Sequence, residues 1–307
     1  MNILLMGGAG FIGLNIAKTL FESGHTVDIV DINSNSTPGV VSAYSINCIH
    51  QMDCSNVAGI LELVDRLRIE CVINLVSNLI PSSSFEEYQR EQNDFMSPAF
   101  QLLNKLAIRG VKYMYFSSGG TVYGHSDQDK IPETSRRNPI NYYGLSKSVY
   151  EDLVLFSNRI HKLEYLIVRP SNPFGPLQSP QKKQGLIAVV VDRMKKNQPI
   201  EIWGDGSNVR DYIWIGDLSI AISRLIDLNQ WNNVYNIGSG QGCSTNEIIS
   251  SIRTLIPSSS KITYTAPRSE DLSKVVLDIR KIQSTIDFKP LDFNKGLEMY
   301  VSGLKNE

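Results

Sequence analysis

Short apolar runs and helix-like patterns alternate along the first part of the chain. Apolar runs bounded by turn residues are typical of buried strands, and they cover residues 2–6, 26–30, 46–50, 71–76, 111–116 and 164–168. Between them, apolar residues recur at helical spacing over residues 11–23, 56–67, 86–108 and 142–160. This alternation predicts an α/β fold, with a doubly wound parallel sheet that carries helices on both faces.

The pattern changes from about residue 170, where prolines at positions 170, 173, 176 and 180 interrupt regular structure. Beyond them we expect helices at 185–196, 217–228, 244–255 and 294–304, and a strand near 212–215. A chain of 307 residues can form two lobes. We expect residues 1–169 to form one domain and residues 170–307 mostly a smaller α/β lobe, with segments such as 234–237 returning to the first sheet.

Glycines gather directly after the first expected strand, at positions 7, 8, 10 and 13. A helix pattern then begins at Phe11, a second strand follows, and Asp31 stands at the carboxyl end of that strand. Glycines let the backbone approach a pyrophosphate, and a helix N-terminus offers N–H donors and a partial positive charge. This order predicts a dinucleotide site, and a glycine-rich turn without a ligand is the alternative. Asp31 would accept the hydroxyls of the adenosine ribose and repel a 2′-phosphate, which favours NAD over NADP.

Tyr143 and Lys147 stand four residues apart in an expected helix, so they share one face of it. A free tyrosine titrates near pH ~10, and an ammonium group within ~4–6 Å favours the phenolate. Tyr143 is therefore a candidate base whose pKa Lys147 would depress. Any helix can carry such a pair, and its weight comes from the dinucleotide signature upstream.

Composition narrows the class of protein. The net charge is −1, which gives no sign of an electrostatic nucleic-acid or membrane partner. The four cysteines show no metal-ligand spacing and are expected to be buried thiols in a reducing compartment, so no metal site is expected. Residues 1–20 lack the pattern of a signal peptide, and no apolar run could span a bilayer. We therefore expect a cytoplasmic enzyme.

The motifs, taken in order, make the chain similar to the extended short-chain dehydrogenase/reductase family, in its branch of NAD-dependent sugar-nucleotide epimerases and dehydratases. They are Gly7–Gly13, Asp31, Asp53, Asn93, Phe116–Gly124, Tyr143 with Lys147, Arg169–Pro176, Trp203–Gly206 and Val209–Tyr212. The resemblance implies a Rossmann-type fold, NAD, a nucleotide-diphosphate sugar (a UDP-sugar above all) and a homodimer formed through helices like 86–108 and 142–160.

The resemblance also implies residue roles. Besides Tyr143 and Lys147, the cofactor would contact Gly7, Gly10, Phe11, Ile12, Gly13, Asp31, Asn33, Asp53, Cys54, Leu75 and Val76. The sugar nucleotide would contact Asn172, Trp203, Arg210, Arg268 and Val275. Trp203 would stack on the base or pack in the core, and Arg210 would bind phosphate or pair with Asp211. Arg268 is a second phosphate candidate, in a looser alignment. Val275 would gate substituents at C2 of the sugar.

One position departs from the family pattern. Where relatives carry the Ser or Thr that hydrogen-bonds beside the catalytic tyrosine, this chain has Gly119. Thr121 is the favoured substitute, because two residues on in a strand it would point to the same side. Ser118 is the second candidate, and a third possibility is that Tyr143 works without either.

The segment from Ser117 to Gly124 contains no carboxylate. Eliminating water needs a general acid and a base near the reacting carbons, and family dehydratases carry acidic residues here, so the gap argues against dehydration. The sequence therefore favours an NAD-dependent nucleotide-sugar 4-epimerase acting on a UDP-hexose or UDP-N-acetylhexosamine, in polysaccharide precursor synthesis. A 4-keto-sugar nucleotide reductase is the alternative, and a non-catalytic regulator that binds the same ligands is a distant third.

Overall fold

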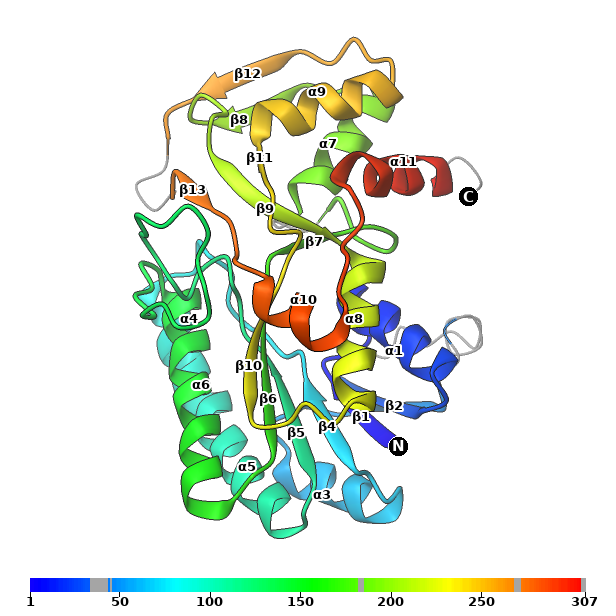
Figure 1. The fold of residues 1–307 in the computed structure, drawn as a ribbon, viewed down its shortest axis with the longest axis vertical. Coiled ribbons are helices and arrows are strands. Elements are labelled where there is room, and N and C mark those ends of the chain that lie inside the picture. The colour runs from blue at the N-terminus through cyan, green and yellow to red at the C-terminus, as the bar shows by residue number, and fades with distance from the viewer. Residues whose placement is uncertain (34–43, 45, 182–184, 268–271, 305–307) are drawn as a thin grey trace.

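The structure, a computed structural model, describes residues 1–33, 44, 46–181, 185–267 and 272–304. Two lobes follow one another along the long axis of the molecule (Figure 1). The lower lobe in that view is built on one large sheet, and the upper lobe contains short strands and three helices. Among the described residues, no helix is both long and apolar enough to cross a membrane.

Seven parallel strands form the sheet of the lower lobe. In spatial order they are β10 (Asn233–Ile237), β6 (Tyr165–Pro170), β5 (Lys112–Phe116), β4 (Cys71–Asn74), β1 (Asn2–Met6), β2 (Thr26–Asp31) and β3 (Cys48–Gln51). The strand order reverses between β1 and β4, and doubly wound sheets bind ligands in the crevice outside such a point. The Rossmann-type fold is therefore confirmed. The segment expected to return to this sheet is β10, which runs parallel to β6.

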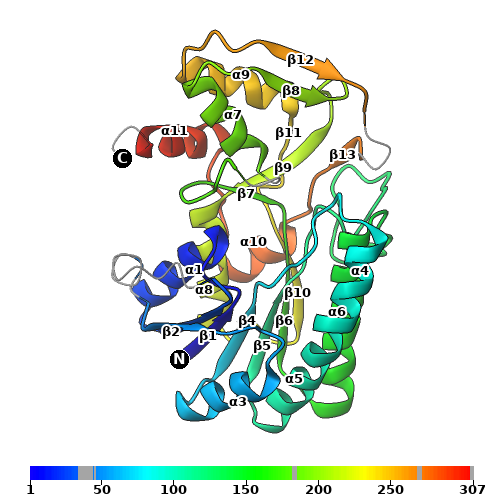
Figure 2. The same cartoon turned by 180° about the vertical axis from the view of Figure 1, so that it is seen from behind.

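Helices cover both faces of this sheet (Figures 1 and 2). One face packs on α1 (Phe11–Glu22), α8 (Ile215–Asp227) and α10 (Arg280–Ile286). The other packs on α3 (Val57–Arg66), α5 (Ser97–Ile108) and α6 (Tyr142–His161). The strands read as nearly continuous apolar runs because both faces are buried.

The upper lobe has its own apolar core between small sheets and helices. Its helices are α7 (Leu186–Lys195), α9 (Thr245–Leu255) and α11 (Phe293–Gly303). Its strands are β7 (Asn172–Phe174), β8 (Ile200–Trp203), β9 (Val209–Trp214), β11 (Gly242–Ser244), β12 (Ile262–Thr265) and β13 (Lys274–Val275). The division into domains at residue 169 stays a prediction. Two elements that follow this residue, β10 and α8, pack in the lower lobe.

Two expected elements differ in detail. The helix expected over 86–108 begins as α4 (Phe85–Glu91), widens into a π-helical segment, η1 (Gln92–Met96), and continues as α5. The strand expected near 212–215 is β9, which ends at Trp214 because Ile215 already begins α8.

Candidate active site

The glycine-rich turn lies at the carboxyl end of β1. Gly7 has φ +70°, which favours glycine, and a Cβ there would come within 3.2 Å of the Val76 backbone. A Cβ on Gly13 would lie 2.3 Å from the carbonyl oxygen of Gly8, so only glycine lets α1 pack this closely on the turn. A Cβ on Gly10 would meet nothing within 4 Å. The turn therefore faces open space at the N-terminus of α1, as a pyrophosphate requires.

Asp31 closes this turn from the end of β2. Its Oδ2 accepts a hydrogen bond from the Ala9 N–H at 3.0 Å, and its Oδ1 accepts one from Asn33 N–H at 3.0 Å. A carboxylate oxygen can accept two hydrogen bonds, so each oxygen keeps capacity for a ribose hydroxyl.

The remaining cofactor candidates lie around the same crevice. Asp53 and Cys54 follow β3, and the Cys54 thiol lies 3.9 Å from the carbonyl oxygen of Val30. Burial raises the pKa of the Cys54 thiol to about 12. Leu75 and Val76 follow β4, and Phe11 and Ile12 are half-buried in the first turn of α1. The fold thus gathers these candidates at the carboxyl ends of four neighbouring strands.

Tyr143 and Lys147 lie on the first turns of α6. The helix begins cleanly because the Asn141 side chain accepts a hydrogen bond from Gly144 N–H at 2.8 Å. Lys147 is buried, and its Nζ donates to the carbonyl oxygen of Phe116, at the end of β5, at 2.9 Å. It lies 5.7 Å from the centre of the Tyr143 ring. Burial lowers the pKa of Lys147 to about 8.

Several causes within the chain act on the pKa of Tyr143. Burial raises the pKa of Tyr143, hydrogen bonding from Ser118 and Ser77 lowers it, and the Glu91 charge raises it. Burial outweighs the rest. Lys147 is not among these causes, although its ammonium group lies 5.7 Å from the centre of the Tyr143 ring, so its effect on this pKa stays a prediction.

The structure removes the reason for preferring Thr121 as the substitute for Gly119. Strand β5 ends at Phe116, and Gly119, Gly120 and Thr121 form a turn, so the strand alternation that favoured Thr121 does not apply. Within the described part of the chain, the Thr121 hydroxyl is buried without a hydrogen-bond partner. Ser118, the second candidate, is the residue whose hydroxyl acts on Tyr143.

Leu277 gives a reason for glycine at position 119. A Cβ added there would lie 2.6 Å from Leu277 Cδ1 and 3.0 Å from the Arg169 carbonyl oxygen. Leu277 is fully buried, so it cannot easily yield. A side chain at position 119 would therefore have to displace the core.

The substrate candidate Asn172 and the catalytic candidate Ser118 lie on either side of Gly120. A Cβ on Gly120 would lie 3.9 Å from Ser118 Oγ and 4.0 Å from Asn172 Oδ1. Asn172 is fixed because its Nδ2 donates to the carbonyl oxygen of Asp211 at 2.8 Å. Its Oδ1 therefore faces the space in front of Ser118, where a sugar ring would lie.

The other substrate candidates lie in the upper lobe. Arg210 is on β9, and its Nη1 donates to the Val209 carbonyl oxygen at 2.9 Å. The Asp211 carboxylate accepts four hydrogen bonds, from Ser239, Gly240 and Leu277. These bonds speak against the alternative in which Asp211 pairs with Arg210.

Trp203 is 47% exposed, so packing in the core is not its main role. In the sequence it directly precedes Gly204, the first residue of a pocket of about 550 Å³ that is lined by Gly204, Asp205, Asn208, Tyr264, Thr265 and Pro267.

Val275 is only 2% exposed, so its side chain offers almost no surface to a ligand. Its role in gating substituents at C2 of the sugar stays a prediction. Arg268 lies outside the described residues.

Sequence reasoning gave no role to four residues near the site: the exposed Ser77 and the buried Glu91, Glu151 and Arg169. Glu151 could have been found, because it follows Lys147 by four residues and so shares its face of the helix. Ser77 and Glu91 are brought in by tertiary packing, and no local pattern marks them.

Away from this crevice, Asp28, Cys48 and His50 on β2 and β3 have ligand atoms within 4.8 Å of one another. The Asp28 carboxylate is already bound by His50 at 2.9 Å and by Asn47 at 3.0 Å. These contacts describe a hydrogen-bonded sheet edge and give no reason to place a metal ion there.

Comparisons with known proteins agree with this geometry. The model of the NAD dependent epimerase/dehydratase family matches residues 3–238. A protein of Methanocaldococcus jannaschii with the provisional name UDP-glucose 4-epimerase is 32% identical over 99% of this chain and 98% of its own. The dTDP-4-dehydro-6-deoxyglucose reductase of Escherichia coli is 27% identical over 99% and 97%.

Among solved structures, the UDP-glucose 4-epimerase of Thermotoga maritima with UDP-glucose superimposes with a TM-score of 0.90, at 29% identity, over 100% of this chain and 99% of that one. The family resemblance is confirmed, because the matching model covers well over half of the chain. The chain belongs to the NAD dependent epimerase/dehydratase family.

Proposed function

We propose that the protein is an NAD-dependent nucleotide-sugar 4-epimerase that acts on a UDP-hexose or a UDP-N-acetylhexosamine. The observation that carries the proposal is the position of Tyr143 beside Ser118, in a segment (117–124) without a carboxylate, with Lys147 near Val76, which lies against Gly7 of the glycine turn. Tyr143 can exchange a proton with the sugar and Lys147 can hold a nicotinamide ribose, whereas the general acid that dehydration needs is missing from this segment.

The chain's residues would share the work as follows. Bound NAD would supply the hydride acceptor and donor. Tyr143 takes the proton from the C4 hydroxyl and later returns it, and Ser118 hydrogen-bonds beside it. Lys147 holds the nicotinamide ribose, and Asn172 orients the sugar. Arg210 binds the diphosphate, and Trp203 stacks on the base at the rim of the pocket it precedes. The fit to NAD rests on the open space at Gly10 and on the two oxygens of Asp31.

A nucleotide 4-keto-sugar reductase is the second candidate. It would use the same residues once, in one direction, and the similarity to the Escherichia coli reductase favours it. A non-catalytic regulator stays a distant third, because a hydrogen bond from Ser118 acts on Tyr143 and answers the absence of a side chain at Gly119 that suggested it.

Product analysis separates the two candidates. The enzyme is incubated with a panel of UDP- and dTDP-sugars, with and without added NADH, and products are identified by NMR. An epimerase should interconvert a UDP-sugar and its C4 epimer without NADH, and retain the C4 hydrogen in D₂O. Stoichiometric oxidation of NADH by a 4-keto sugar, with no turnover of ordinary UDP-hexoses, would reverse the ranking.

Replacing Asp31 by Ala is expected to weaken NAD binding and to improve NADP binding relative to it. The carboxylate accepts ribose hydroxyls and repels a 2′-phosphate, and the variant loses both effects. Titration calorimetry with the two cofactors measures this. Asp53→Ala is the control, because Asp53 lies further along the crevice and should leave the NAD/NADP ratio nearly unchanged. Equal affinity of the unmutated protein for both cofactors would reject the proposed role of Asp31.

Ser118→Ala is expected to lower turnover about tenfold or more, the effect of losing one hydrogen bond to a charged oxygen. Thr121→Val should have little effect, because it removes a buried hydroxyl that has no partner among the described residues. Initial rates at saturating substrate compare the two. The opposite order would restore Thr121 as the substitute for the family Ser or Thr.

We also propose a homodimer in the cytoplasm, assembled through α5 and α6. Support comes from apolar side chains exposed on these helices: Ile108 is 79% exposed, Phe156 41% and Ile160 58%. A helix pair that buried these residues in a second copy would remove them from water. Light scattering coupled to size-exclusion chromatography gives the mass, and a monomer at micromolar concentration would reject the dimer. A role in polysaccharide precursor synthesis is part of the same proposal.

A further inference from the structure

Glu91 is a buried carboxylate next to the catalytic helix. It is the last residue of α4, directly before the π-helical segment, and it is 7% exposed. Its Oε2 accepts a short hydrogen bond from the Ser146 hydroxyl on α6. This contact joins a buried carboxylate of α4 to the turn of α6 that carries Lys147.

A buried carboxylate needs more than one hydroxyl group. Burying an unpaired charge is so costly that such a group is normally paired or neutralised. Arg90, its neighbour on α4, is exposed. Lys147 is also buried, and its ammonium group donates to the backbone carbonyl oxygens of Phe116 at 2.9 Å and Val76 at 3.5 Å. It also lies over the rings of Tyr115 and Tyr143. Among the described contacts, neither of the two buried charges has an oppositely charged group within ion-pair distance, and Glu91 is the first of the charges that act on Lys147.

The second acid near Lys147 is already engaged. Glu151 is bound by Arg169 through two hydrogen bonds, at 2.9 and 2.6 Å, and by the Ser117 hydroxyl at 2.5 Å. Its charge is therefore largely balanced by Arg169. Glu91 is left as the acid whose charge Lys147 can balance.

We propose that Glu91 is the counter-charge of the Lys147 ammonium group and a positioning residue for the Tyr143–Lys147 pair. The inference rests on the function proposed above. Glu91 touches neither substrate nor cofactor and acts through Lys147. It keeps that side chain charged, so that the ammonium group can hold a nicotinamide ribose at neutral pH.

The electrostatics give the direction of the effect. Burial lowers the pKa of Lys147 to about 8, and Glu91, followed by Glu151, raises it. Glu91 also raises the pKa of Tyr143, after the larger effects of burial and of Ser118. The Glu91 charge also acts on Tyr115 of β5 and, on its own helix α4, on Tyr88. Loss of the Glu91 charge should therefore lower the pKa of both Lys147 and Tyr143.

The test is Glu91→Gln, which keeps the size of the side chain and an oxygen for Ser146 but removes the charge. Both limbs of the pH profile of kcat should move to lower pH by about one unit, the effect of one nearby charge. Asp94→Asn is the matched control, because it removes an exposed acid from the following turn and should leave the profile in place. Ser146→Ala removes the hydrogen bond but keeps the charge, and it should also leave the limbs in place.

A second readout does not depend on turnover. The titration of Lys147 is followed by NMR of protein labelled at the lysine side chains, with the signal assigned by Lys147→Met. Glu91→Gln should move this titration to lower pH, and an unmoved titration in the folded variant would overturn the proposal. If the unmutated protein turns over no sugar nucleotide, the proposed function fails, yet the NMR titration still decides the pairing. If Glu91→Gln does not fold, Glu91→Asp withdraws the charge by one methylene and should give a smaller shift in the same direction, whereas no shift would overturn the pairing.

Discussion

Tyr143→Phe is expected to lower turnover of the sugar nucleotide by at least ~10²-fold, the low end of acid–base effects in enzymes. The substitution removes only the phenolic oxygen, which is the group that exchanges a proton with the C4 hydroxyl. NAD affinity should change little, because Lys147 and the glycine turn remain. Steady-state kinetics and cofactor titration measure the two effects separately.

Tyr142 provides a matched control for this experiment. It is the neighbouring residue on α6 and is 37% exposed, and its ring contacts Phe85 and Tyr88. Tyr142→Phe removes the same atom and keeps these ring contacts, so it should retain near-normal turnover. Equal losses in the two variants would show that the effect of Tyr143→Phe is not due to proton transfer.

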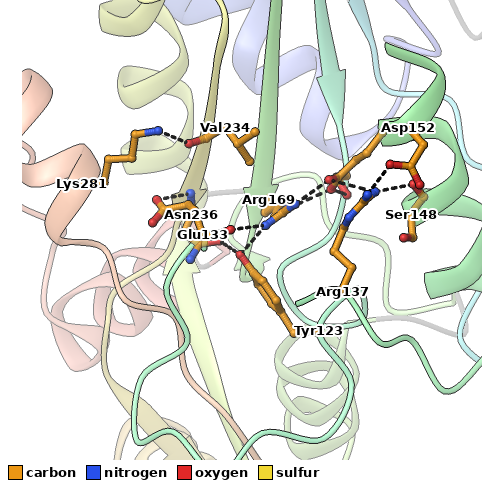
Figure 3. Close-up of polar contacts among 11 residues, drawn as sticks. Tyr123, Glu133, Arg137, Ser148, Asp152, Arg169, Val234, Asn236 and Lys281 are labelled. Atoms are coloured by element: carbon orange, nitrogen blue, oxygen red, sulfur yellow. Dashed lines mark hydrogen bonds and ion pairs between the residues drawn. The ribbon is translucent and has the colours of Figure 1, made fainter. Parts of the chain in front are cut away.

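The second large effect concerns stability. Arg169→Met is expected to lower the free energy of unfolding by about 3–5 kcal/mol, the usual cost of leaving a buried charge unpaired. Arg169 binds Glu151, which is fully buried, and it also donates to the Tyr123 hydroxyl at 2.8 Å and to the Glu133 carbonyl oxygen at 3.2 Å (Figure 3). The substitution leaves the Glu151 carboxylate with one hydroxyl and a more distant guanidinium group. Urea unfolding of the protein without cofactor measures the loss.

Two further variants make the stability test specific. Arg137 lies 3.4 Å from the same carboxylate but is bound mainly to Asp152 and to the Ser148 carbonyl oxygen at the surface of α6 (Figure 3). Arg137→Met should therefore cost much less. The double variant Arg169→Met with Glu151→Met removes both buried charges and should recover most of the stability. A double variant as unstable as Arg169→Met would show that the packing of Arg169 matters more than its charge.

Local patterns in the sequence were sufficient to predict where the residues of the expected cofactor site lie in the fold. The glycine turn, Asp31 and the pair on α6 each depend on neighbours within a few residues, so spacing alone predicts their geometry. The long helix and the parallel sheet were predicted for the same reason, apart from the π-helical segment that follows Glu91.

The hydroxyl beside Tyr143 could not be predicted in this way. The strand alternation was extended past Phe116, but the chain turns there, because Gly119 N–H bonds to the carbonyl oxygen of Pro170 at 2.9 Å and Val122 N–H bonds to that of Ser118 at 3.2 Å. The contacts of Glu91 with Ser146 and of Arg169 with Glu151 also join segments that are distant in sequence. Such partners follow from packing, and a single sequence carries no local signal for them.

The contact between Gly119 and Leu277 has a consequence for how this sequence could have evolved. A mutation of Gly119 to serine that came first would collide with Leu277, whose side chain lies 2.6 Å from the new Cβ. A smaller residue at 277 that came first would open a void in the core, which is itself destabilising. Each single step is costly, although the pair together could be tolerated. Positions 119 and 277 are therefore expected to be coupled: serine at position 119 should be tolerated better beside a smaller residue at position 277 than beside leucine.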